Sequence, residues 1–281
     1  MDPRAWSVSG RTCVITGAST GIGREAAISL GRLGARLVLV GRSSRRHRLV
    51  IADLETESIE FELIEAELSD LRSIATAAGQ IAERHPEASV LINNAGQGGR
   101  RGTTPDGFEM AFGVNYLSHY LLTRRLLNAF IRNSPARIVN LSSNAHYDIK
   151  SFDPEAGLGR TRSLTGLPEY AYSKAAMAAF ALELAHRLVD TGVKSVAVHP
   201  GLVATDGWRA VPQPIRWFMT RRMATPAQGV LPVLQAVLDP DLRSGTYLTP
   251  DGEKMIHPLA AHPETTRRLW DLSERRVAPY L

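Results

Sequence analysis

The stretch "TGASTGIG", residues 16–23, places three glycines between a short apolar segment and an amphipathic one. The preceding residues "RTCVITG" (11–17) are typical of a buried strand, and residues 21–34 have the periodicity of a helix that ends at Gly34. Glycine allows a tight turn and a close approach to phosphate, and the helix N-terminus offers free N–H groups. The spacing is not G-x-G-x-x-G, and an ordinary strand–helix turn is the alternative. In this context the stretch predicts a dinucleotide-binding turn formed by Gly17, Ser19, Thr20, Gly21, Ile22 and Gly23.

Short apolar segments alternate with helix-length segments along most of the chain. This alternation predicts a parallel sheet with helices on both faces, a doubly wound α/β (Rossmann) fold. No repeat or linker divides the sequence, so we expect a single domain over 1–281, with 11–143 mainly binding a cofactor and 144–281 carrying a catalytic helix, a substrate loop and C-terminal helices. Strands are expected at 11–17, 35–41, 58–66, 88–96, 136–143 and 193–201, and helices at 21–34, 69–84, 106–133 and 168–191.

The composition is that of a soluble globular protein, with 281 residues of which 44% are hydrophobic and 22% are charged. No uncharged apolar stretch approaches the roughly 20 residues of a membrane span. The N-terminus lacks the apolar run of a secretory signal. The single cysteine, Cys13, excludes an intrachain disulfide and suits a reducing compartment. We therefore expect a cytoplasmic protein without an integral membrane segment.

The net charge of +5 raises the question of a nucleic-acid partner. The basic residues are scattered, in "SSRRHR" (43–48), "GRRG" (99–102) and "TRRM" (220–223), and no aromatic side chains alternate with them as a base-stacking groove requires. A solvated basic surface with one phosphate site is therefore expected, and no nucleic acid. The histidines and the lone cysteine form no ligand cluster, so no metal is expected.

The end of the second expected strand indicates which dinucleotide is bound. In "LVLVGRSSRRHR" (37–48), Arg42 follows the strand directly and no acid occurs before Asp53. An acid there would hold the ribose of NAD, whereas an arginine accommodates the 2′-phosphate of NADP with two donors. A surface arginine cluster is the alternative. The sequence favours NADP(H), bound through Arg42 and the hydroxyl of Ser43.

Six motifs in order resemble the short-chain dehydrogenase/reductase family. They are "TGASTGIG" (16–23), "NNAG" (93–96), "VNYLSHYLLT" (114–123), "NLSS" (140–143), "YAYSK" (170–174) and "HPG" (199–201), and they cover residues from about 11 to 201. Within the family, "DGFEMAFGVNYLSHYLLTRRLL" (106–127), "RIVNLSSNAH" (137–146) and "RRLWDLSE" (267–274) are similar to the retinol-dehydrogenase-like branch.

The resemblance implies roles for particular residues. Ser143 would hydrogen-bond the substrate carbonyl, Tyr170 and Lys174 would form the Y-x-x-x-K pair, and Asn115 would organise a helix and a water in a proton relay. The residues lining the nucleotide would be Asn93, Ala95 and Gly96, with Pro200, Gly201, Val203 and Thr205 around the nicotinamide. Where many members have Asp-Leu beside the adenine, this chain has Glu67 and Leu68, which puts the hydrogen bond to the adenine amino group in doubt.

The stretch "EYAYSKAAM" (169–177) contains two candidate tyrosines. Pro168 suits the first turn of a helix, and residues four apart share a helix face whereas residues two apart do not. Tyr170 is therefore expected to point with Lys174 into the site, and Tyr172 to be a pocket or packing residue. A tyrosine with its ordinary pKa near 10 exchanges protons poorly at neutral pH. We expect Lys174 and the oxidised nicotinamide together to lower that pKa, and Lys174 to bind the nicotinamide ribose as well.

These residues predict an NADPH-dependent reductase of a lipophilic, polycyclic or aromatic ketone or aldehyde. The first alternative is the reverse reaction, an NADP-dependent alcohol dehydrogenase of retinol or steroid type. The second is a regulator that binds NADP without turnover, which would be expected to lack Tyr170 or Lys174. Residues 144–169 and 206–223 are expected to cover the pocket, the latter as a lid or else as a membrane-surface helix. The alanine-rich segment 173–188 packs either on its own sheet or on a partner in a dimer or tetramer.

Overall fold

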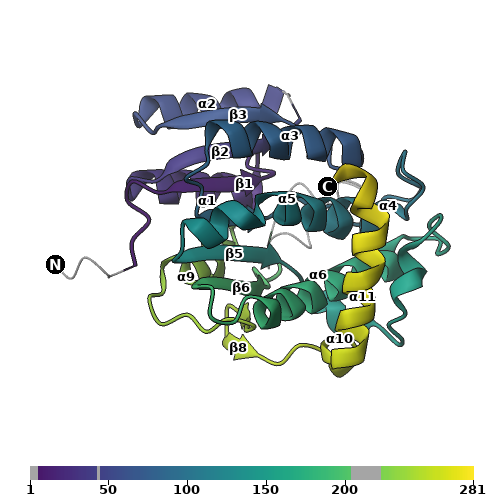
Figure 1. Ribbon diagram of the computed structural model, residues 1–281. Coiled ribbons are helices and arrows are strands. Elements are labelled where there is room, and N and C mark those ends of the chain that lie inside the picture. Colours follow the sequence, from purple (N-terminus) through teal and green to yellow (C-terminus); the bar gives the residue numbers. More distant parts are fainter. Residues whose placement is uncertain (1–5, 43–44, 204–222) are drawn as a thin grey trace.

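The computed structural model describes residues 6–42, 45–203 and 223–281. Its centre is an eight-stranded sheet with the order β3-β2-β1-β4-β5-β6-β7-β8, parallel except for the antiparallel pair β7 and β8 (Figure 1). The predicted doubly wound fold is thereby confirmed. The strands are β1 Thr12–Thr16, β2 Arg36–Gly41, β3 Phe61–Glu65, β4 Val90–Asn93, β5 Ala136–Leu141, β6 Val193–Val198, β7 Tyr247–Thr249 and β8 Gly252–Lys254.

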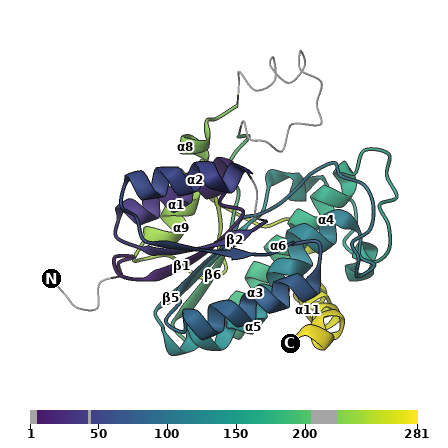
Figure 2. The ribbon, with the colours of Figure 1, turned by 90° about the horizontal axis from the view of Figure 1, so that it is seen from above.

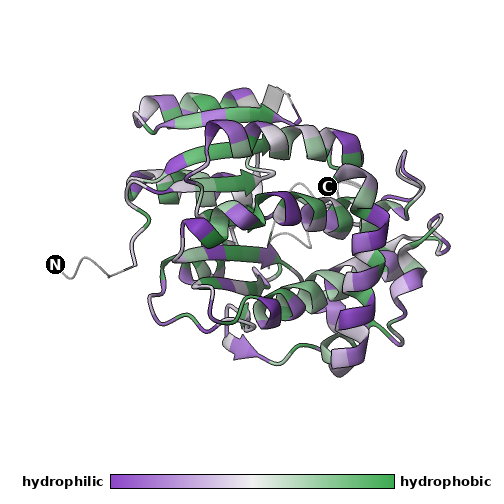
Figure 3. Ribbon diagram, in the orientation of Figure 1, coloured by the Kyte–Doolittle hydropathy of each residue, from purple (hydrophilic) through white to green (hydrophobic). Residues whose placement is uncertain are grey.

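Helices cover both faces of this sheet (Figure 2). The helices α1 (Gly21–Arg32), α2 (Arg45–Thr56) and α9 (Leu231–Leu238) lie on one face, and α3 (Leu71–Arg84), α5 (Ser118–Arg132), α6 (Leu167–Arg187) and α11 (Pro263–Val277) lie on the other. The strands bury apolar residues on both sides, so the core consists of two clusters separated by the sheet. Figure 3 shows hydrophobic colour along the strands and hydrophilic colour along the outer helix faces. The remaining short helices are α4 Met110–Phe112, α8 Pro226–Gly229 and α10 Pro258–Ala261.

The segment 106–133, predicted as one helix, is divided in the structure. It contains α4, a π-helical turn at Gly113–Leu117, and then α5. A π turn places one extra residue in the helix and is frequent at functional sites. Here it includes Asn115, one of the predicted site residues.

Helix α2 and strands β7 and β8 were not expected from the sequence. No helix was expected at the position of α2, because few apolar residues mark its inner face; Val50 and Leu54 are buried there. Strands β7 and β8 have only three residues each, too few for a recognisable alternation.

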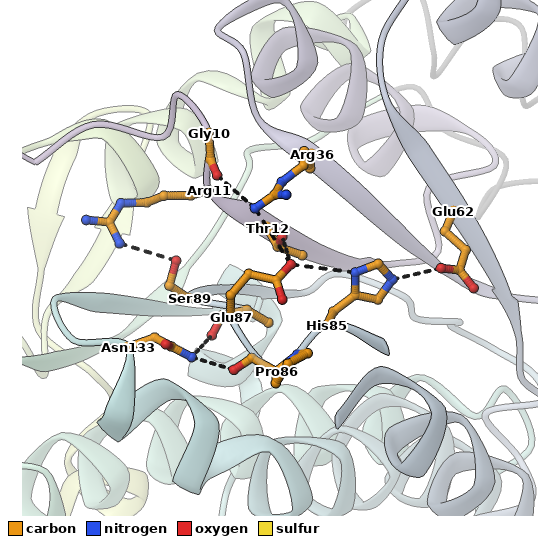
Figure 4. Close-up of polar contacts among 11 residues, drawn as sticks. Gly10, Arg11, Thr12, Arg36, Glu62, His85, Pro86, Glu87, Ser89 and Asn133 are labelled. Atoms are coloured by element: carbon orange, nitrogen blue, oxygen red, sulfur yellow. Dashed lines mark hydrogen bonds and ion pairs between the residues drawn. The ribbon is translucent and has the colours of Figure 1, made fainter. Parts of the chain in front are cut away.

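Polar contacts fasten the amino ends of the strands (Figure 4). The hydroxyl of Thr12 donates to Glu87 at 2.6 Å, and Nε2 of His85 lies 2.8 Å from Glu62. Arg11 donates to Ser89 at 3.3 Å. These bonds join β1 and β3 to the connection before β4, so the amino edge is occupied by contacts within the protein. The candidate site lies at the opposite, carboxyl edge, where ligands bind in sheets of this kind.

None of the described helices combines the length and apolar character that crossing a membrane requires. Helix α6 carries the alanine-rich segment, and residues 171–181 are buried in the single chain. Of the two alternatives for that segment, the structure shows packing within its own chain, against β6 and α11 among others. The segment therefore presents no alanine face for a partner helix.

Candidate active site

The glycine-rich turn after β1 has a conformation that requires glycine. Gly17 and Gly21 have φ values of +69° and +58°, in the left-handed region. At Gly23 a Cβ atom would lie 2.4 Å from Nδ2 of Asn94 and 2.5 Å from the carbonyl oxygen of Gly17. The turn is thus packed too closely for any side chain at position 23.

Helix α1 begins at this turn with its first N–H groups available. Its N-cap is Thr20, whose side chain makes no capping bond, and its first turn contains no acidic residue. The orphan N–H groups and the positive helix end favour an anion. Ser19 and Ile22 are partly exposed at the same opening. This arrangement fits a pyrophosphate, as predicted for these residues.

Thr16 and Asn94 hold the turn in place, and the sequence analysis did not single them out. The amide of Asn94 donates to the hydroxyl of Thr16 at 2.9 Å, and its Nδ2 donates to the carbonyl of Thr16 at 2.8 Å. Ala95 N also donates to the Thr16 hydroxyl, at 3.0 Å. These bonds join the loops after β1 and β4, where the strand order reverses. The signal was present in "NNAG" (93–96), in which Asn93, Ala95 and Gly96 were considered but Asn94 was not.

The structure changes the expectation for Asn93. Its side chain is buried and donates to Asn140 at 2.8 Å and to Thr123 at 3.0 Å, inside the core. It does not point toward the nucleotide opening, so a contact with the nucleotide is restricted to its backbone. The physical reason is its position on β4, which is buried on both faces: the side chain faces α5, which carries Thr123, and the neighbouring β5, which carries Asn140.

Arg42 follows β2, and its side chain is 67% exposed. Its Nη1 lies 3.7 Å from Oε2 of Glu67, a loose ion pair. The other Glu67 oxygen accepts bonds from the amide and hydroxyl of Ser69, at 3.2 and 3.0 Å. Glu67 is therefore oriented by Ser69 and Arg42, while Leu68 is buried beneath it. Ser43 lies outside the described residues.

Ser143 and Tyr170 meet at the carboxyl edge. Ser143 caps the short 3-10 turn Asn144–Asp148, and its Oγ accepts a bond from Ala145 N at 3.2 Å. Burial raises the pKa of Tyr170, and a hydrogen bond with Ser143 opposes that rise. The sequence analysis expects Lys174 and the oxidised nicotinamide together to lower this pKa; in the protein alone, desolvation of the phenol is the larger effect and the pKa lies above its ordinary value.

Lys174 is almost fully buried behind Tyr170, one helical turn away. Its Nζ donates to the carbonyl of Leu141 at 2.8 Å and lies 5.7 Å from the centre of the Tyr170 ring. Burial lowers the pKa of Lys174 to about 8. A Cβ atom on Gly96 would lie only 3.3 Å from Nζ, so the loop after β4 passes directly over the ammonium group. A supporting residue that was missed, Ser142, donates to the carbonyl of Lys174 at 2.7 Å.

Asn115 connects three parts of the site. Its Oδ1 accepts from Gln97 N at 2.8 Å, and its Nδ2 donates to Gln97 O and to the Ser173 hydroxyl, both at 2.9 Å. The π turn thus ties the loop after β4 to the helix that carries Tyr170 and Lys174. This bonding fits the predicted role of organising the helix.

Tyr172 points away from Lys174, as predicted. Its ring lies 4.9 Å from Phe152 and 5.9 Å from Phe112, and its hydroxyl donates to the carbonyl of Asp153. It is therefore a packing residue that fixes the substrate loop on α6.

The loop after β6 contributes the remaining described positions. Gly201 has φ +90°, and a Cβ on Gly229 would lie 2.4 Å from Val203, so α8 packs on this loop. Pro200 is partly exposed beside them. Thr205 and most of the predicted lid, 206–222, lie outside the described residues. His146 lies in the turn after Ser143 and His199 follows β6: Nδ1 of His146 bonds the Ser143 carbonyl at 2.8 Å, and Nδ1 of His199 accepts from Asn144 N at 3.3 Å.

Comparison with known proteins agrees with this geometry. The short chain dehydrogenase family model matches residues 11–215. Human retinol dehydrogenase 13 is 34% identical over 291 residues, covering 98% of this chain and 87% of its own. Human retinol dehydrogenase 11 is 37% identical over 272 residues, covering 94% and 85%. A crystal structure of an NAD(P)-dependent gluconate 5-dehydrogenase candidate from Beutenbergia cavernae with bound NADP has a TM-score of 0.70 at 26% identity, covering 87% of this chain and 96% of its own.

The chain belongs to the short-chain dehydrogenase/reductase family. It is an oxidoreductase of that family, similar to the retinol dehydrogenases, and its cofactor is NAD(P)(H). The glycine turn without room for a Cβ, the free N-terminus of α1 and the exposed guanidinium after β2 fit such a dinucleotide.

Proposed function

We propose that the protein interconverts a lipophilic alcohol and its aldehyde or ketone with NADP(H), in the manner of a retinol dehydrogenase. The observation that carries the proposal is the joint position of Ser143, Tyr170 and Lys174 at the carboxyl edge of the sheet. The similarity to retinol dehydrogenases favours the alcohol dehydrogenase alternative over a dedicated ketone reductase.

The choice of NADP(H) over NAD(H) rests on charge. Arg42 offers a guanidinium at the end of β2 that can bind a 2′-phosphate with two donors. Its present partner, Glu67, is 3.7 Å away and itself bonded to Ser69, so the guanidinium keeps free donors. The NADP in the related gluconate 5-dehydrogenase candidate is consistent with this choice.

The proton chemistry follows from the residues themselves. The bound cofactor supplies hydride to the substrate carbon in reduction and accepts it in oxidation. The hydroxyls of Ser143 and Tyr170 hold the substrate oxygen, and Tyr170 gives it a proton in reduction or takes one in oxidation. Lys174 lies one helical turn behind the phenol, where its positive charge favours the phenolate once substrate and cofactor are in place. Asn115 keeps helix α6 and the loop over Lys174 in register.

A turnover panel tests the proposal. Retinol and retinal, aliphatic and aromatic alcohols and aldehydes, and steroids would each be supplied with NADP(H) and with NAD(H), and the nicotinamide absorbance followed. We expect turnover with NADP(H), and loss of turnover in Ser143→Ala at unchanged cofactor affinity. Tight NADPH binding with no turnover of any compound would favour the non-catalytic regulator instead.

A further inference from the structure

A pocket lined by arginines opens beside the site, and the proposed function does not use it. It has a volume of about 340 Å³ and is lined by Arg101, Arg160, Thr161 and Arg162. The three arginines are exposed, whereas Thr161 is buried. This volume is in the range of small-molecule binding sites, roughly 300–1,000 Å³.

The two loops that form the pocket are bonded to each other. The amide of Gly102 donates to the Thr161 hydroxyl at 2.9 Å, and the amide of Thr161 donates to the Gly102 carbonyl at 3.3 Å. The same hydroxyl lies 2.6 Å from Oε1 of the buried Glu109. The other Glu109 oxygen accepts from Phe112 N at 2.9 Å. Both carboxylate oxygens of Glu109 are therefore bonded to Thr161 and α4, and Glu109 does not pair with the arginines of the pocket.

Within residues 6–42, 45–203 and 223–281, no carboxylate forms an ion pair with Arg101, Arg160 or Arg162. The nearest acid along the loop, Glu169, is saturated by other donors: Arg162 N at 2.9 Å, Ser163 N at 2.8 Å and the Ser163 hydroxyl. Partial burial opposes ionisation of Glu169, but these bonds outweigh it and hold its pKa below the ordinary value. Three guanidiniums therefore face one space with their donors free.

The pocket is close to Tyr170 along both loops. A Cβ atom on Gly98 would lie 3.4 Å from the Tyr170 ring. Arg101 is three residues after Gly98, so the Cα atoms of Gly98 and Arg101 are at most about 11 Å apart. On the other loop, the bonds from Arg162 and Ser163 end at Glu169, the residue before Tyr170. The loops that carry the arginines therefore both run from the proposed reacting centre.

We propose that Arg101, Arg160 and Arg162 bind an anionic group, a carboxylate or a phosphate, carried by the substrate at the end away from its reacting carbon. The inference rests on the proposed function and narrows its substrate class to amphiphilic alcohols and aldehydes with an acidic end. The guanidiniums attract and orient that end, and the proton transfer at Tyr170 is unchanged.

The test compares 10-oxodecanoate with its methyl ester, which has the same chain without the charge. KM and kcat with NADPH would be measured for the natural protein, for R101Q/R160Q, and for the control R132Q/K194Q. The control removes the same charge at the amino edge of the sheet, where Arg132 ends α5 and Lys194 belongs to β6. The natural protein should have the lower KM for the acid. In R101Q/R160Q the acid-to-ester KM ratio should rise roughly 2- to 30-fold, the product of two exposed charge contacts, with kcat retained.

Dissociation constants of the two compounds with the Tyr170→Phe variant separate the inference from the proposed function, since they need no turnover. The Tyr170→Phe variant could bind the acid more tightly than the ester, through Arg101 and Arg160, while the natural protein shows no turnover. That result would contradict the proposed function and support the anion site. Equal affinity for acid and ester, or the same loss in the control, would overturn the inference. Inorganic phosphate should compete with the acid and leave the ester unaffected. An effect of phosphate on the ester through these arginines would mean a site for free anions and would also overturn it.

Discussion

Arg42→Asp tests the assignment of the cofactor. The Arg42 side chain is 67% exposed and its only described ion pair, with Glu67, is 3.7 Å long. A pair of this kind contributes at most about 1 kcal/mol to folding. The variant should therefore fold with nearly unchanged stability, and any loss of cofactor affinity can be attributed to the lost guanidinium.

The expected size of the effect follows from the bonds that are lost. A hydrogen bond to a charged group contributes about 1.5–3 kcal/mol, so loss of the phosphate contact should weaken NADPH binding roughly 10- to 150-fold. The new carboxylate would stand beside Glu67 and repel the 2′-phosphate further. NADH has no such phosphate, and a carboxylate at this place can bind its ribose diol, so its affinity should stay equal or improve.

Fluorescence titration with NADPH and NADH measures both dissociation constants. Arg48→Asp is the matched control, because Arg48 is an exposed arginine on α2 and undergoes the same change of charge. It should leave NADPH binding within a few fold. An equal loss of both cofactors in Arg42→Asp would show that Arg42 supports the turn itself, and the argument from the phosphate would be wrong.

Three further predictions concern packing and pH. Gly23→Ala places a methyl group 2.4 Å from Asn94 Nδ2, so it should destabilise the protein by about 1–3 kcal/mol in thermal melts and abolish NADPH binding. Gly79→Ala in α3 is the control: no atom lies closer than 3.9 Å to the added methyl group, so this variant should be neutral or stabilising. Burial lowers the pKa of His119 to about 4, so between pH 6.5 and 4 the unfolded chain binds a proton at this residue that the folded protein does not. The free energy of unfolding should therefore fall as pH drops from about 6.5 to 4. In urea titrations, His119→Gln should reduce this dependence on pH. Burial raises the pKa of Tyr170 above its ordinary value near 10, so alcohol oxidation, which needs the deprotonated phenol, should accelerate as pH rises above neutrality. Carbonyl reduction needs the protonated phenol and should slow only as pH approaches that pKa; parallel pH profiles in both directions would contradict a single titrating group.

The strand and helix succession and the main site positions could be predicted because they depend on local patterns. The glycine turn follows from glycines placed between a strand and a helix, and the Tyr170–Lys174 face follows from helical spacing; the structure agrees with both. Of the two roles left open for Tyr172, the structure shows packing. What could not be predicted depends on contacts between distant segments. The direction of the Asn93 side chain, the bond from Lys174 to the Leu141 carbonyl and the burial that raises the pKa of Tyr170 are set by neighbours far away in sequence.

The π turn at Asn115 illustrates the same limit. Its sequence continues the helical periodicity, and only the bonds to Gln97 and Ser173 show why one extra residue is accommodated there. Likewise Arg101 was interpreted as part of a scattered basic surface, because only contacts between distant loops, such as that of Gly102 with Thr161, bring it near Arg160 and Arg162.

The central claim, that Tyr170 transfers the proton, is tested most directly by single-turnover rates of Tyr170→Phe and Tyr172→Phe, measured with saturating NADPH and an aldehyde substrate. Each variant removes one hydroxyl from the same helix. Tyr170→Phe should keep its NADPH affinity and lose roughly 10²- to 10⁴-fold in rate, the usual cost of a lost general acid. Tyr172→Phe loses only the bond to the Asp153 carbonyl and should keep most of the rate. A fast Tyr170→Phe variant beside a slow Tyr172→Phe variant would contradict the account.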